Sequence, residues 1–482
     1  MRLCDLLPPD VPCPPGKDNV EVFGLTSSSA SAGAGSLFAG LPGTKVDGSV
    51  YATDAIKRGA VAVLIARGKP VEVPSHVALI ETDNPRRTLA LMSAAFFGAQ
   101  PEHAVAVTGT SGKTSVADFT RQIFAQLGHR AASLGTIGVV KPDGAVYGSL
   151  TTPDPITLHA ALAGLAQEGV THLAFEASSH GLDQHRLDGV RLTAAAFTNL
   201  GRDHMDYHAT VEDYLAAKLR LFTDLLPRGR TVVVNADGAY AARVMETVSG
   251  AGHRVMTVGR AGTTLRLANV AREGFQQVLT VGADHKTTTV RLPLIGAYQI
   301  ENALVAAGLA IAAGEDCQRA LSALEYLKGV PGRLDVAGAF RGGLAIVDYA
   351  HKPEALAAAL DACRPFATGQ LICVFGCGGD RDKGKRPIMG KIAVEKADVV
   401  IVTDDNPRTE VPAAIRNEIL AGANGAREIG DRAQAIRTAI GLMSAGDVVL
   451  VAGKGHETGQ IVGGRVVPFS DHDEITRAIE SR

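Results

Sequence analysis

The stretch from residue 104 to residue 115, AVAVTGTSGKTS, combines residue types that could bind phosphate. Its first four residues predict a short buried strand, and the chain then turns through Gly109 and Gly112 into a helix that begins at Lys113. Glycine lets a backbone wrap closely around an anion, and the free amides of a helix N-terminus attract negative charge. Lys113 is therefore expected to reach the β- and γ-phosphates of a nucleotide, and Thr114 to bind Mg²⁺. The competing interpretation is a glycine turn with a chance lysine.

Acidic and histidine side chains follow two further predicted strands. The sequence THLAFEASSHGLDQHR, residues 171–186, places Glu176 at a strand's carboxyl end, where a parallel sheet faces its ligands. That carboxylate could hold Mg²⁺ opposite the phosphate loop, or it could be a strand-end glutamate in solvent. FTNLGRDHMDYH, residues 197–208, favours one histidine, His204 or His208, as a ligand to magnesium or to a magnesium-bound group. The alternative is a metal-free polar loop.

Two other motifs are ambiguous. Lys218 lies in the apolar helical stretch YLAAKLRLF, residues 214–222, and periodicity alone favours a lysine whose ammonium group reaches solvent. The tripeptide NAD at 235–237 follows a predicted strand and could hold a nucleotide or cap a helix.

Four charged loops follow predicted strands near the end of the chain, at residues 348–354, 375–387, 403–410 and 452–460. Each could be an ordinary turn between a strand and a helix. Because they share one edge of one parallel sheet, together they predict a site for anionic or zwitterionic groups. Arg381 and Arg408 can each bind a carboxylate through two parallel hydrogen bonds, and Glu457 could accept a hydrogen bond from an ammonium group.

The elements that position these loops predict an α/β protein, because strands and helices alternate along most of its 482 residues. A chain of that length is too long to fold around one hydrophobic core. Linker-like FGAQPEH at 97–103 and a renewed pattern after VPGRLD at 330–335 mark two boundaries. We expect a small N-terminal α/β domain (1–101), a central P-loop ATPase domain with a mainly parallel sheet (102–330) and a C-terminal Rossmann-like domain (331–482). Residues 264–293 carry three strand-like stretches and predict a β-rich edge.

The composition excludes several classes of protein. Net charge is −2 and no basic block is present, so no nucleic-acid partner is expected. No apolar run of about 18 residues predicts a membrane span, and the N-terminal residues lack a secretory pattern. None of the six cysteines forms a C-x-x-C pair, so neither a zinc site nor a disulfide framework is expected. A cytoplasmic location is the simplest inference.

Taken together, the motifs resemble the Mur ligase family over essentially the whole chain. The motifs are GTSGKT at 109–114, EASSHGLDQHR at 176–186, NLGRDHMDYH at 199–208, AAK at 216–218, GAYQIENALVA at 296–306, PGRLD at 331–335, DYAHKPE at 348–354, GCGGDRDKGKRP at 376–387 and AGKGHE at 452–457. DNPR at 405–408 resembles the members that add meso-diaminopimelate, since the lysine-adding relatives lack this arginine.

The resemblance implies an ATP- and Mg²⁺-dependent amide-bond ligase that joins meso-diaminopimelate to UDP-N-acetylmuramoyl-L-alanyl-D-glutamate through an acyl phosphate. It further implies a role in cytoplasmic peptidoglycan precursor synthesis. Three reactants bound by three domains imply domain closure during turnover. A monomer is expected.

The resemblance also implies roles for matched residues. ATP would contact Thr108, Gly109, Thr110, Ser111, Gly112, Lys113, Thr114, Asn302 and Arg333. The UDP end of the substrate would contact Ser27, Ser29, Thr44, Lys45 and Val46, and its muramoyl-peptide part Thr151, Thr152, Ser178, Gln184 and Arg186. Diaminopimelate would contact Arg381, Asp405, Asn406, Pro407, Arg408, Gly453 and Glu457. Catalysis would use Lys113, Lys218, Glu176 and His204, and the metal ions would be placed by Thr114, Glu176, His204 and Lys218, the last as a carbamate.

The sequence departs from the family pattern at three positions. Ala30 stands where an arginine is common, so one contact to the uridine nucleotide is missing. Gln299 replaces an asparagine, which changes a fine contact, and Lys352 replaces a threonine, which we regard as neutral.

Some other functions would share part of these motifs. A lysine-adding ligase would share the chemistry, but DNPR argues against it. A folylpolyglutamate synthetase lacks an N-terminal UDP-binding domain of this kind. A P-loop kinase or a regulatory ATPase would leave the arginine-rich C-terminal loops without a role, and a pure scaffold would leave the phosphate loop without one.

Overall fold

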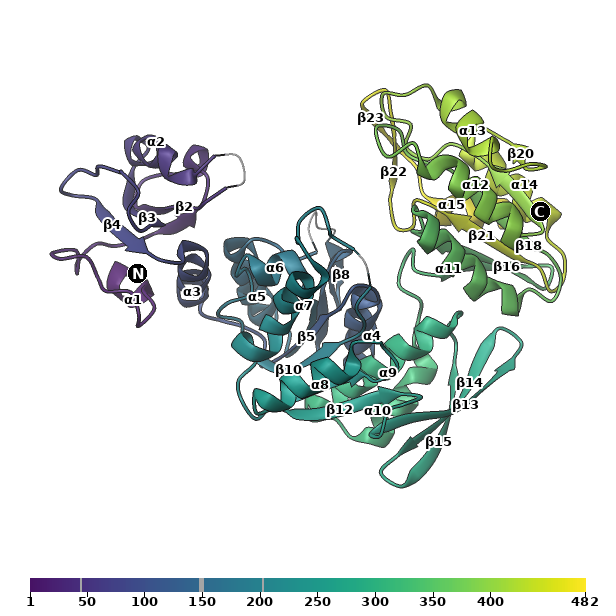
Figure 1. Ribbon diagram of the computed structural model, residues 1–482, viewed down its shortest axis with the longest axis horizontal. Helices are drawn as coiled ribbons and strands as arrows, with labels where there is room; N and C mark the ends of the chain where they lie inside the picture. The colour runs from purple at the N-terminus through teal and green to yellow at the C-terminus, as the bar shows by residue number, and fades with distance from the viewer. Residues whose placement is uncertain (44–45, 147–150, 202) are drawn as a thin grey trace. The chain divides into compact units, whose positions relative to one another are not determined.

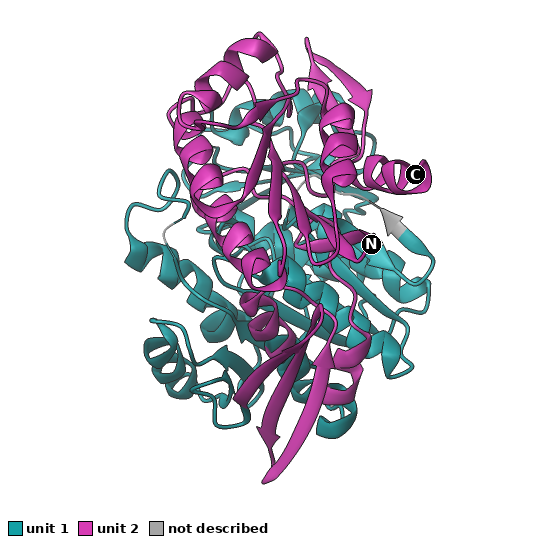
Figure 2. Cartoon of the chain, turned by 90° about the vertical axis from the view of Figure 1, so that its right-hand side faces the viewer, with its two compact units in different colours: residues 1–266, 305–320 teal, residues 267–304, 321–482 magenta. Residues whose placement is uncertain are grey.

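The computed structural model describes residues 1–43, 46–146, 151–201 and 203–482 (Figure 1). Two compact units share the chain (Figure 2). The first unit comprises residues 1–266 and 305–320, and the second comprises residues 267–304 and 321–482. Mainly parallel sheets covered by helices confirm the predicted α/β class.

The first unit opens with a parallel four-stranded sheet of order β1-β2-β3-β4. Its strands are β1 (Gly24–Thr26), β2 (Ser36–Gly40), β3 (Ala60–Ala66) and β4 (Ala78–Thr82), and its helices are α1 (Leu3–Leu6), η1 (Ser29–Ser31), η2 (Gly48–Tyr51), α2 (Ala52–Lys57) and α3 (Pro85–Phe97). Parallel strands are buried on both faces. One face packs on α1 and α3, and the other packs on α2. Asn84 caps α3 and Pro85 begins it, which fixes the start of that helix.

An eleven-stranded sheet follows, and eight of its strands lie in the same unit, in the order β12-β11-β10-β5-β9-β6-β7-β8. Its strands are β5 (His103–Thr108), β6 (Ala131–Gly135), β7 (Gly138–Lys141), β8 (Gly144–Val146), β9 (His172–Glu176), β10 (Leu192–Phe197), β11 (Thr231–Asn235) and β12 (Arg254–Gly259). Pairing is parallel from β12 to β6. Because β5 lies between β9 and β10, the strand order reverses beside it, and ligands bind at the carboxyl edge of such a switch point.

The helices of this sheet lie between its strands, as expected. They are α4 (Lys113–Gln126), α5 (Pro155–Gln167), α6 (Ser179–Asp183), α7 (Val211–Arg220), η3 (Leu221–Leu225) and α8 (Ala241–Gly250). Side chains of α5 and α8 share one core with β9, β10 and β11.

The second unit begins with β13 (Leu265–Glu273), β14 (Gln276–Ala283) and β15 (Lys286–Leu292), which confirms the three strands expected at 264–293. The helices α9 (Ala297–Ala312), which ends among residues of the first unit, α10 (Cys317–Ala323) and η4 (Leu324–Tyr326) follow. A six-stranded sheet has the order β16-β17-β21-β18-β19-β20. Its strands are β16 (Asp335–Phe340), β17 (Gly343–Asp348), β18 (Leu371–Phe375), β19 (Val399–Val402), β20 (Arg427–Glu428) and β21 (Val448–Ala452), and β22 (Gly459–Val462) pairs with β23 (Arg465–Pro468) as a separate hairpin.

Helices cover both faces of the six-stranded sheet. One face packs on α11 (Pro353–Cys363), η5 (Arg364–Phe366), α12 (Lys385–Lys396) and α13 (Pro412–Leu420), and the other on α14 (Arg432–Leu442) and α15 (Asp471–Glu480). Arg432 and Asp471, both fully buried, join α14 to α15 through two hydrogen bonds of 2.7 and 2.8 Å. A buried pair of this kind is strongly destabilising when one partner is removed.

One expectation from the cysteines is wrong. Cys4 and Cys13 form a disulfide with their Cα atoms 5.4 Å apart, although they do not have the spacing of a C-x-x-C pair. The two cysteines are nine positions apart, and α1 with the proline-containing loop after it brings their side chains together. Across the described ranges, none of the helices has the length and apolar character needed to cross a membrane.

Candidate active site

The predicted phosphate loop lies at the carboxyl end of β5 and leads into α4. Gly109 and Gly112 have φ angles of 150° and 86°, which other residues rarely adopt. A Cβ atom on Gly109 would lie 1.9 Å from Thr198 Oγ1, so only glycine fits there. Thr198 Oγ1 donates to the Ser111 carbonyl at 2.7 Å, and the Ser111 amide donates to Asn199 Oδ1 at 3.0 Å. The end of β10 therefore holds the loop in place.

Two lysines converge on this loop. Lys113 Nζ donates to the carbonyls of Gly109 and Thr110, both at 2.9 Å. Lys218 Nζ donates to the Gly109 carbonyl at 2.7 Å and lies 4.2 Å from the ring centroid of Tyr214. Both side chains bond to the carbonyls of the turn, and the charge of Lys113 suits the loop to a polyanion.

Lys218 does not reach solvent, so the interpretation favoured by periodicity is wrong. It is only 1% exposed, because α7 packs its last turn against the phosphate loop. Burial lowers the pKa of Lys218 well below its ordinary value, and the nearby charge of Lys113 contributes to the same shift. The amine is therefore biased towards its neutral, nucleophilic form.

Glu176 ends β9, the strand beside β5, and it is buried rather than solvated. Its carboxylate accepts from the Thr136 amide at 2.6 Å and from the Thr136 hydroxyl at 3.3 Å. A Cβ on Gly135 would lie 2.1 Å from Glu176 Oε1, so the glycine makes room for the carboxylate. Glu176 thus has a fixed position at the same sheet edge as the phosphate loop.

The residues expected to bind the muramoyl-peptide part form one network around Glu176. Thr151 Oγ1 lies 3.0 Å from Thr136 Oγ1, and Thr152 Oγ1 donates to the Glu176 carbonyl at 3.1 Å. Ser178 Oγ donates to Thr152 Oγ1 at 3.0 Å. Arg186 donates to the Thr152 carbonyl at 2.7 Å and to Gln184 Oε1 at 2.8 Å. The structure therefore brings all five predicted residues together.

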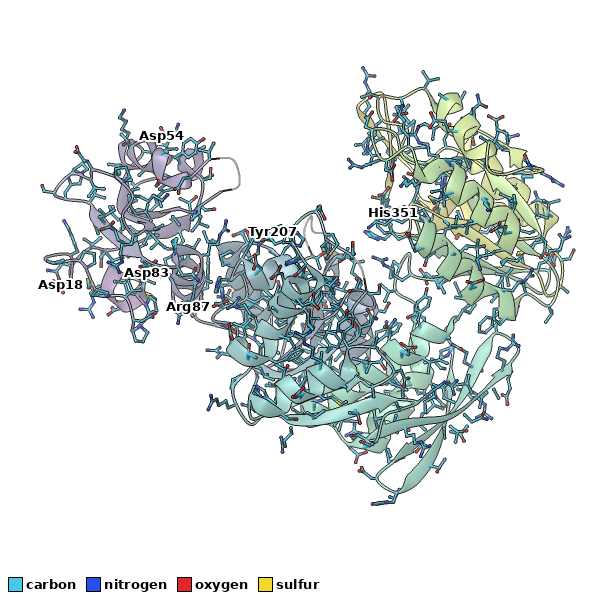
Figure 3. The ribbon with its side chains drawn as sticks, viewed as in Figure 1. Asp18, Asp54, Asp83, Arg87, Tyr207 and His351 are labelled. Carbon is cyan, nitrogen blue, oxygen red and sulfur yellow. A yellow bond between two sulfur atoms is a disulfide. The ribbon has the colours of Figure 1, made fainter. Side chains whose placement is uncertain are left out.

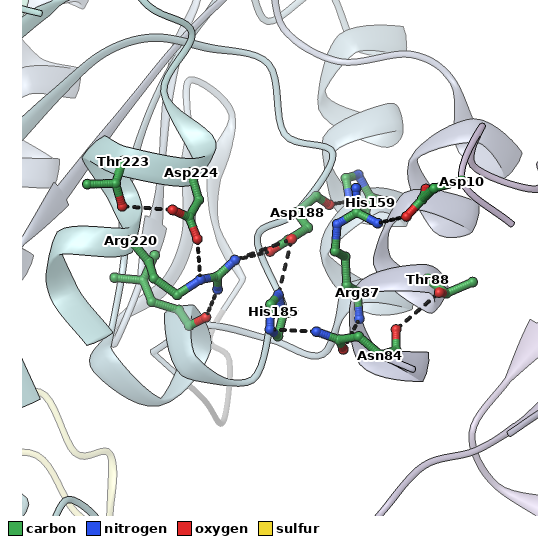
Figure 4. A network of polar contacts seen from close by, with 11 residues as sticks. Asp10, Asn84, Arg87, Thr88, His159, His185, Asp188, Arg220, Thr223 and Asp224 are labelled. Atoms are coloured by element: carbon green, nitrogen blue, oxygen red, sulfur yellow. Dashed lines mark hydrogen bonds and ion pairs between the residues drawn. The ribbon is translucent and has the colours of Figure 1, made fainter. Parts of the chain in front are cut away.

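A second polar network fixes the segment that carries Gln184 and Arg186 (Figure 4). His185, whose φ of 56° is left-handed, lies 2.9 Å from Asn84 Nδ2 and 3.2 Å from Asp188 Oδ1. Arg220 of α7 also contacts Asp188, at 3.4 Å. These contacts tie the segment to α3 and α7, which accounts for its unusual backbone.

His204 and His208 follow β10, and His180 lies in α6. The ring of His204 lies 4.9 Å from that of His180 and 6.0 Å from that of Tyr214. Burial lowers the pKa of His180, His204 and His208, so all three favour the neutral form that can bind a metal. His208 Nε2 is buried and makes no hydrogen bond within the described ranges.

In the second unit, Asn302 and Arg333 are linked through Gln299. Asn302 Nδ2 donates to Gln299 Oε1 at 2.9 Å, and Gln299 Nε2 donates to the Arg333 carbonyl at 2.9 Å. The guanidinium of Arg333 stacks 5.2 Å from the ring of Tyr349. Burial raises the pKa of the neighbouring Asp348 to about 6, against the opposing effect of Arg333. Gln299 therefore holds the pair together despite its departure from the family pattern.

The DNPR loop follows β19 and lies beside the loop after β21. Asn406 Nδ2 donates to Glu457 Oε2 at 2.9 Å. The fully buried Lys454 donates to Asn406 Oδ1 at 3.1 Å and to Glu457 Oε2 at 3.0 Å. Asp405 Oδ2 is buried and accepts no hydrogen bond from any residue that the structure describes. An ammonium group of a ligand would satisfy this oxygen.

Arg408 is held in a left-handed conformation, with φ of 52°. Its amide donates to the Ile461 carbonyl at 2.9 Å, and its Nη1 donates to the Gly379 carbonyl at 2.8 Å. Strain of this kind persists only where surrounding contacts enforce it, and it concentrates at functional sites. One of five N–H donors is thus used for orientation, and the others are suited to a carboxylate.

Several predicted residues lie outside these groups. Ser27 and Ser29 follow β1, and Ser29 donates a hydrogen bond that contributes to a lowered pKa of Asp54. Val46 is exposed, whereas Thr44 and Lys45 lie outside the described residues. Arg381 is exposed on the loop after β18. Gly453 adjoins Asp405, since a Cβ there would lie 2.5 Å from Asp405 Oδ2.

Comparisons with known proteins agree along the chain. Residues 21–97 match the Mur ligase family, catalytic domain, residues 107–310 the Mur ligase middle domain, and residues 332–455 the Mur ligase, glutamate ligase domain. A Brucella melitensis protein is 58% identical, with 96% of this chain and 95% of that protein covered. A Bradyrhizobium diazoefficiens protein is 56% identical over 100% of both chains. The chain belongs to the Mur ligase family.

Both relatives of this Mur ligase carry the name UDP-N-acetylmuramoyl-L-alanyl-D-glutamate–2,6-diaminopimelate ligase. A solved structure with the same name is 33% identical, covers 95% of each chain and has a TM-score of 0.73. The three-domain α/β architecture expected from the sequence is confirmed by these comparisons.

Sequence reasoning missed several residues of this Mur ligase site. Tyr207, labelled in Figure 3, donates to Asp183 at 2.7 Å and accepts from Gln184 at 3.1 Å. Tyr214, one helical turn before Lys218, could have been found from its spacing of four residues. Lys454 stands in a glycine-rich loop after a strand, which is also a recognisable signal. Thr136 carries no local signal, because its partner Glu176 is 40 residues away.

Proposed function

We propose that this Mur ligase joins meso-2,6-diaminopimelate to UDP-N-acetylmuramoyl-L-alanyl-D-glutamate at the expense of ATP. The observation that carries the proposal is the DNPR loop, where Asp405 has a buried, unsatisfied oxygen, Asn406 bonds to Glu457 and Arg408 is held in a fixed orientation. Diaminopimelate has two amino-carboxyl centres. Such a zwitterion would find carboxylate acceptors for its ammonium and a guanidinium for its distal carboxylate.

The proposed reaction has two steps. The carboxylate of the D-glutamyl residue attacks the γ-phosphorus of ATP, ADP leaves, and an acyl phosphate forms. The amine of diaminopimelate then attacks the acyl carbon, phosphate leaves, and the amide remains. Lys113 would neutralise charge on the transferred phosphoryl group, and the Thr152 and Arg186 network would orient the carboxylate.

Magnesium ions and a carbamate on Lys218 belong to the same proposal. Magnesium prefers oxygen ligands, and Thr114, Glu176 and the neutral His204 lie on elements that adjoin the phosphate loop. When bound, Mg²⁺ supplies positive charge to the phosphates. A carbamate forms when an unprotonated amine attacks carbon dioxide and loses a proton. The lowered pKa of the buried Lys218 supports that step.

We further propose domain boundaries near residues 101 and 330, a cytoplasmic location in peptidoglycan precursor synthesis and a monomeric state. The UDP end of the substrate would bind at Ser27, Ser29 and the turn that contains Val46. Light scattering tests the monomer, and a uridine-nucleotide titration of the Ser29→Ala variant tests the UDP site.

One experiment tests the proposed activity directly. The protein is incubated with ATP, Mg²⁺, the UDP-muramoyl dipeptide and, in parallel, meso-diaminopimelate, L-lysine or L-glutamate. Mass spectrometry should reveal the amide with diaminopimelate, together with stoichiometric ADP and phosphate. An amide formed with lysine in preference would identify the lysine-adding alternative. Nucleotide hydrolysis without any amide would instead support a regulatory ATPase.

A further inference from the structure

A group of histidines lies at the sheet edge opposite the phosphate loop. His103 begins β5 and His172 begins β9, and the two residues face each other in the parallel ladder. His129 follows α4, the helix that begins with Lys113, and Glu315 lies in the loop between α9 and α10. All four belong to the first unit. The proposed ligase reaction uses none of them.

The geometry directs three of these side chains at one point. Glu315 Oε1 lies 2.8 Å from His129 Nε2 and 3.9 Å from His172 Nε2. One donor atom each from His129, His172 and Glu315 lies within 4.8 Å of the other two. The rings of His129 and His172 stack with their centroids 3.8 Å apart. Two nitrogens and one carboxylate oxygen therefore converge.

Burial and orientation make the group more than a surface ion pair. The side chains of His172, Glu315 and His129 are 7%, 13% and 32% exposed. Thr171 Oγ1 lies 2.9 Å from His172 Nδ1, so that nitrogen is engaged and Nε2 is the one that faces Glu315. Burial, together with His129 and His103, lowers the pKa of His172 to about 4. The ring is neutral at physiological pH and keeps a lone pair that can bind a metal.

Two imidazoles and a carboxylate form a ligand set that binds zinc with a fourth position open to water. Magnesium and calcium prefer oxygen ligands, so a set with two nitrogen donors favours zinc over either. Zinc holds such donors at about 2.0–2.2 Å.

We propose that His129, His172 and Glu315 bind a zinc-type divalent cation at the amino edge of the large sheet, away from the ATP loop. The ion would join three segments: the end of α4, the start of β9 and the loop before α10. Arg319 of α10 already contacts this region, since its Nη2 donates to the Leu127 carbonyl at 3.4 Å. The ion would therefore strengthen a junction at the far end of the helix that carries Lys113.

The test uses the full chain after chelator treatment, with Mg²⁺ kept saturating so that magnesium sites are filled. Zn²⁺ is titrated by calorimetry, and Co²⁺ is added separately to read the visible spectrum of a tetrahedral site. His129→Gln and Glu315→Gln remove one ligand each at positions that retain some exposure. His76→Gln, an exposed histidine in a turn, is the matched control.

We expect one Zn²⁺ per chain for the wild type and for His76→Gln, with a rise in thermal midpoint on binding. Each ligand variant should bind at least about 100-fold more weakly and show neither the thermal shift nor the tetrahedral Co²⁺ spectrum. Circular dichroism confirms that the variants are folded. Equal Zn²⁺ affinity in all four proteins, or no Zn²⁺ binding by the wild type, would overturn the proposal. Because no step uses ligase activity, the result does not depend on the proposed function.

Discussion

Replacement of Arg408 by alanine should impair the use of diaminopimelate far more than the use of lysine. The two amino acids share one amino-carboxyl centre and the side-chain methylenes, but lysine lacks the distal carboxylate. Arg408 is oriented by its contact with the Gly379 carbonyl, and its remaining donors are suited to that carboxylate. Loss of a two-point, charge-assisted contact at a half-buried site costs about 2–4 kcal/mol.

This free energy corresponds to a fall of about 30- to 900-fold in kcat/KM for diaminopimelate. Most of the fall should come from KM, because the contact is remote from the reacting amine and is equally strong in ground and transition states. The assay measures amide formation with each amino acid for the wild type and for Arg408→Ala. Arg465→Ala, at an exposed arginine on the adjacent hairpin, is the control. Equal losses with lysine and diaminopimelate, or no loss with either, would refute the assignment of Arg408 to the distal carboxylate.

Three other predictions concern Lys113, Asp348 and the buried pair of Arg432 and Asp471. Lys113→Ala should lower kcat by at least about 100-fold in a phosphate-release assay, and wild-type turnover would exclude its role at the phosphates. Asp348 has a pKa of about 6 in the fold against 3.8 ordinarily, so its contribution to stability is full below pH 3.8 and is lost as pH rises through 6. The stability of the wild type relative to Asp348→Asn should therefore fall by about 3 kcal/mol over that range in urea unfolding, and a constant difference would contradict the cause. Arg432→Met should destabilise the chain by about 3–5 kcal/mol, and adding Asp471→Leu should restore most of the loss; a double variant no more stable than the single one would argue against the buried pair.

The central strands could be predicted well because a parallel sheet buries both of its faces. Their sequences are short continuous apolar runs, and the strand expected at 231–235 has the same bounds as β11. The hairpin of β22 and β23 gave no such run, since all four residues of β23 are exposed. Short antiparallel elements at the periphery depend on pairing rather than on burial, so periodicity does not detect them.

The candidate site also has parts that the sequence predicts and parts that it does not. The phosphate loop could be predicted because its glycines, lysine and helix start are adjacent in sequence. The burial of Lys218 could not, since its partner Gly109 is 109 residues away. The histidine group around Glu315 was missed for the same reason, because the fold brings together residues that are far apart in sequence. Cys4 and Cys13 are only nine positions apart, but cysteine spacing alone does not specify a pairing.

The transfer of oxygen from substrate to phosphate tests the central claim most directly. Both oxygens of the reacting carboxylate of the D-glutamyl residue are labelled with ¹⁸O. The mass of the inorganic phosphate released on reaction with diaminopimelate is then measured. Activation through an acyl phosphate predicts one ¹⁸O atom in each phosphate, carried over from the carboxylate. Unlabelled phosphate, formed together with amide product, would contradict the account.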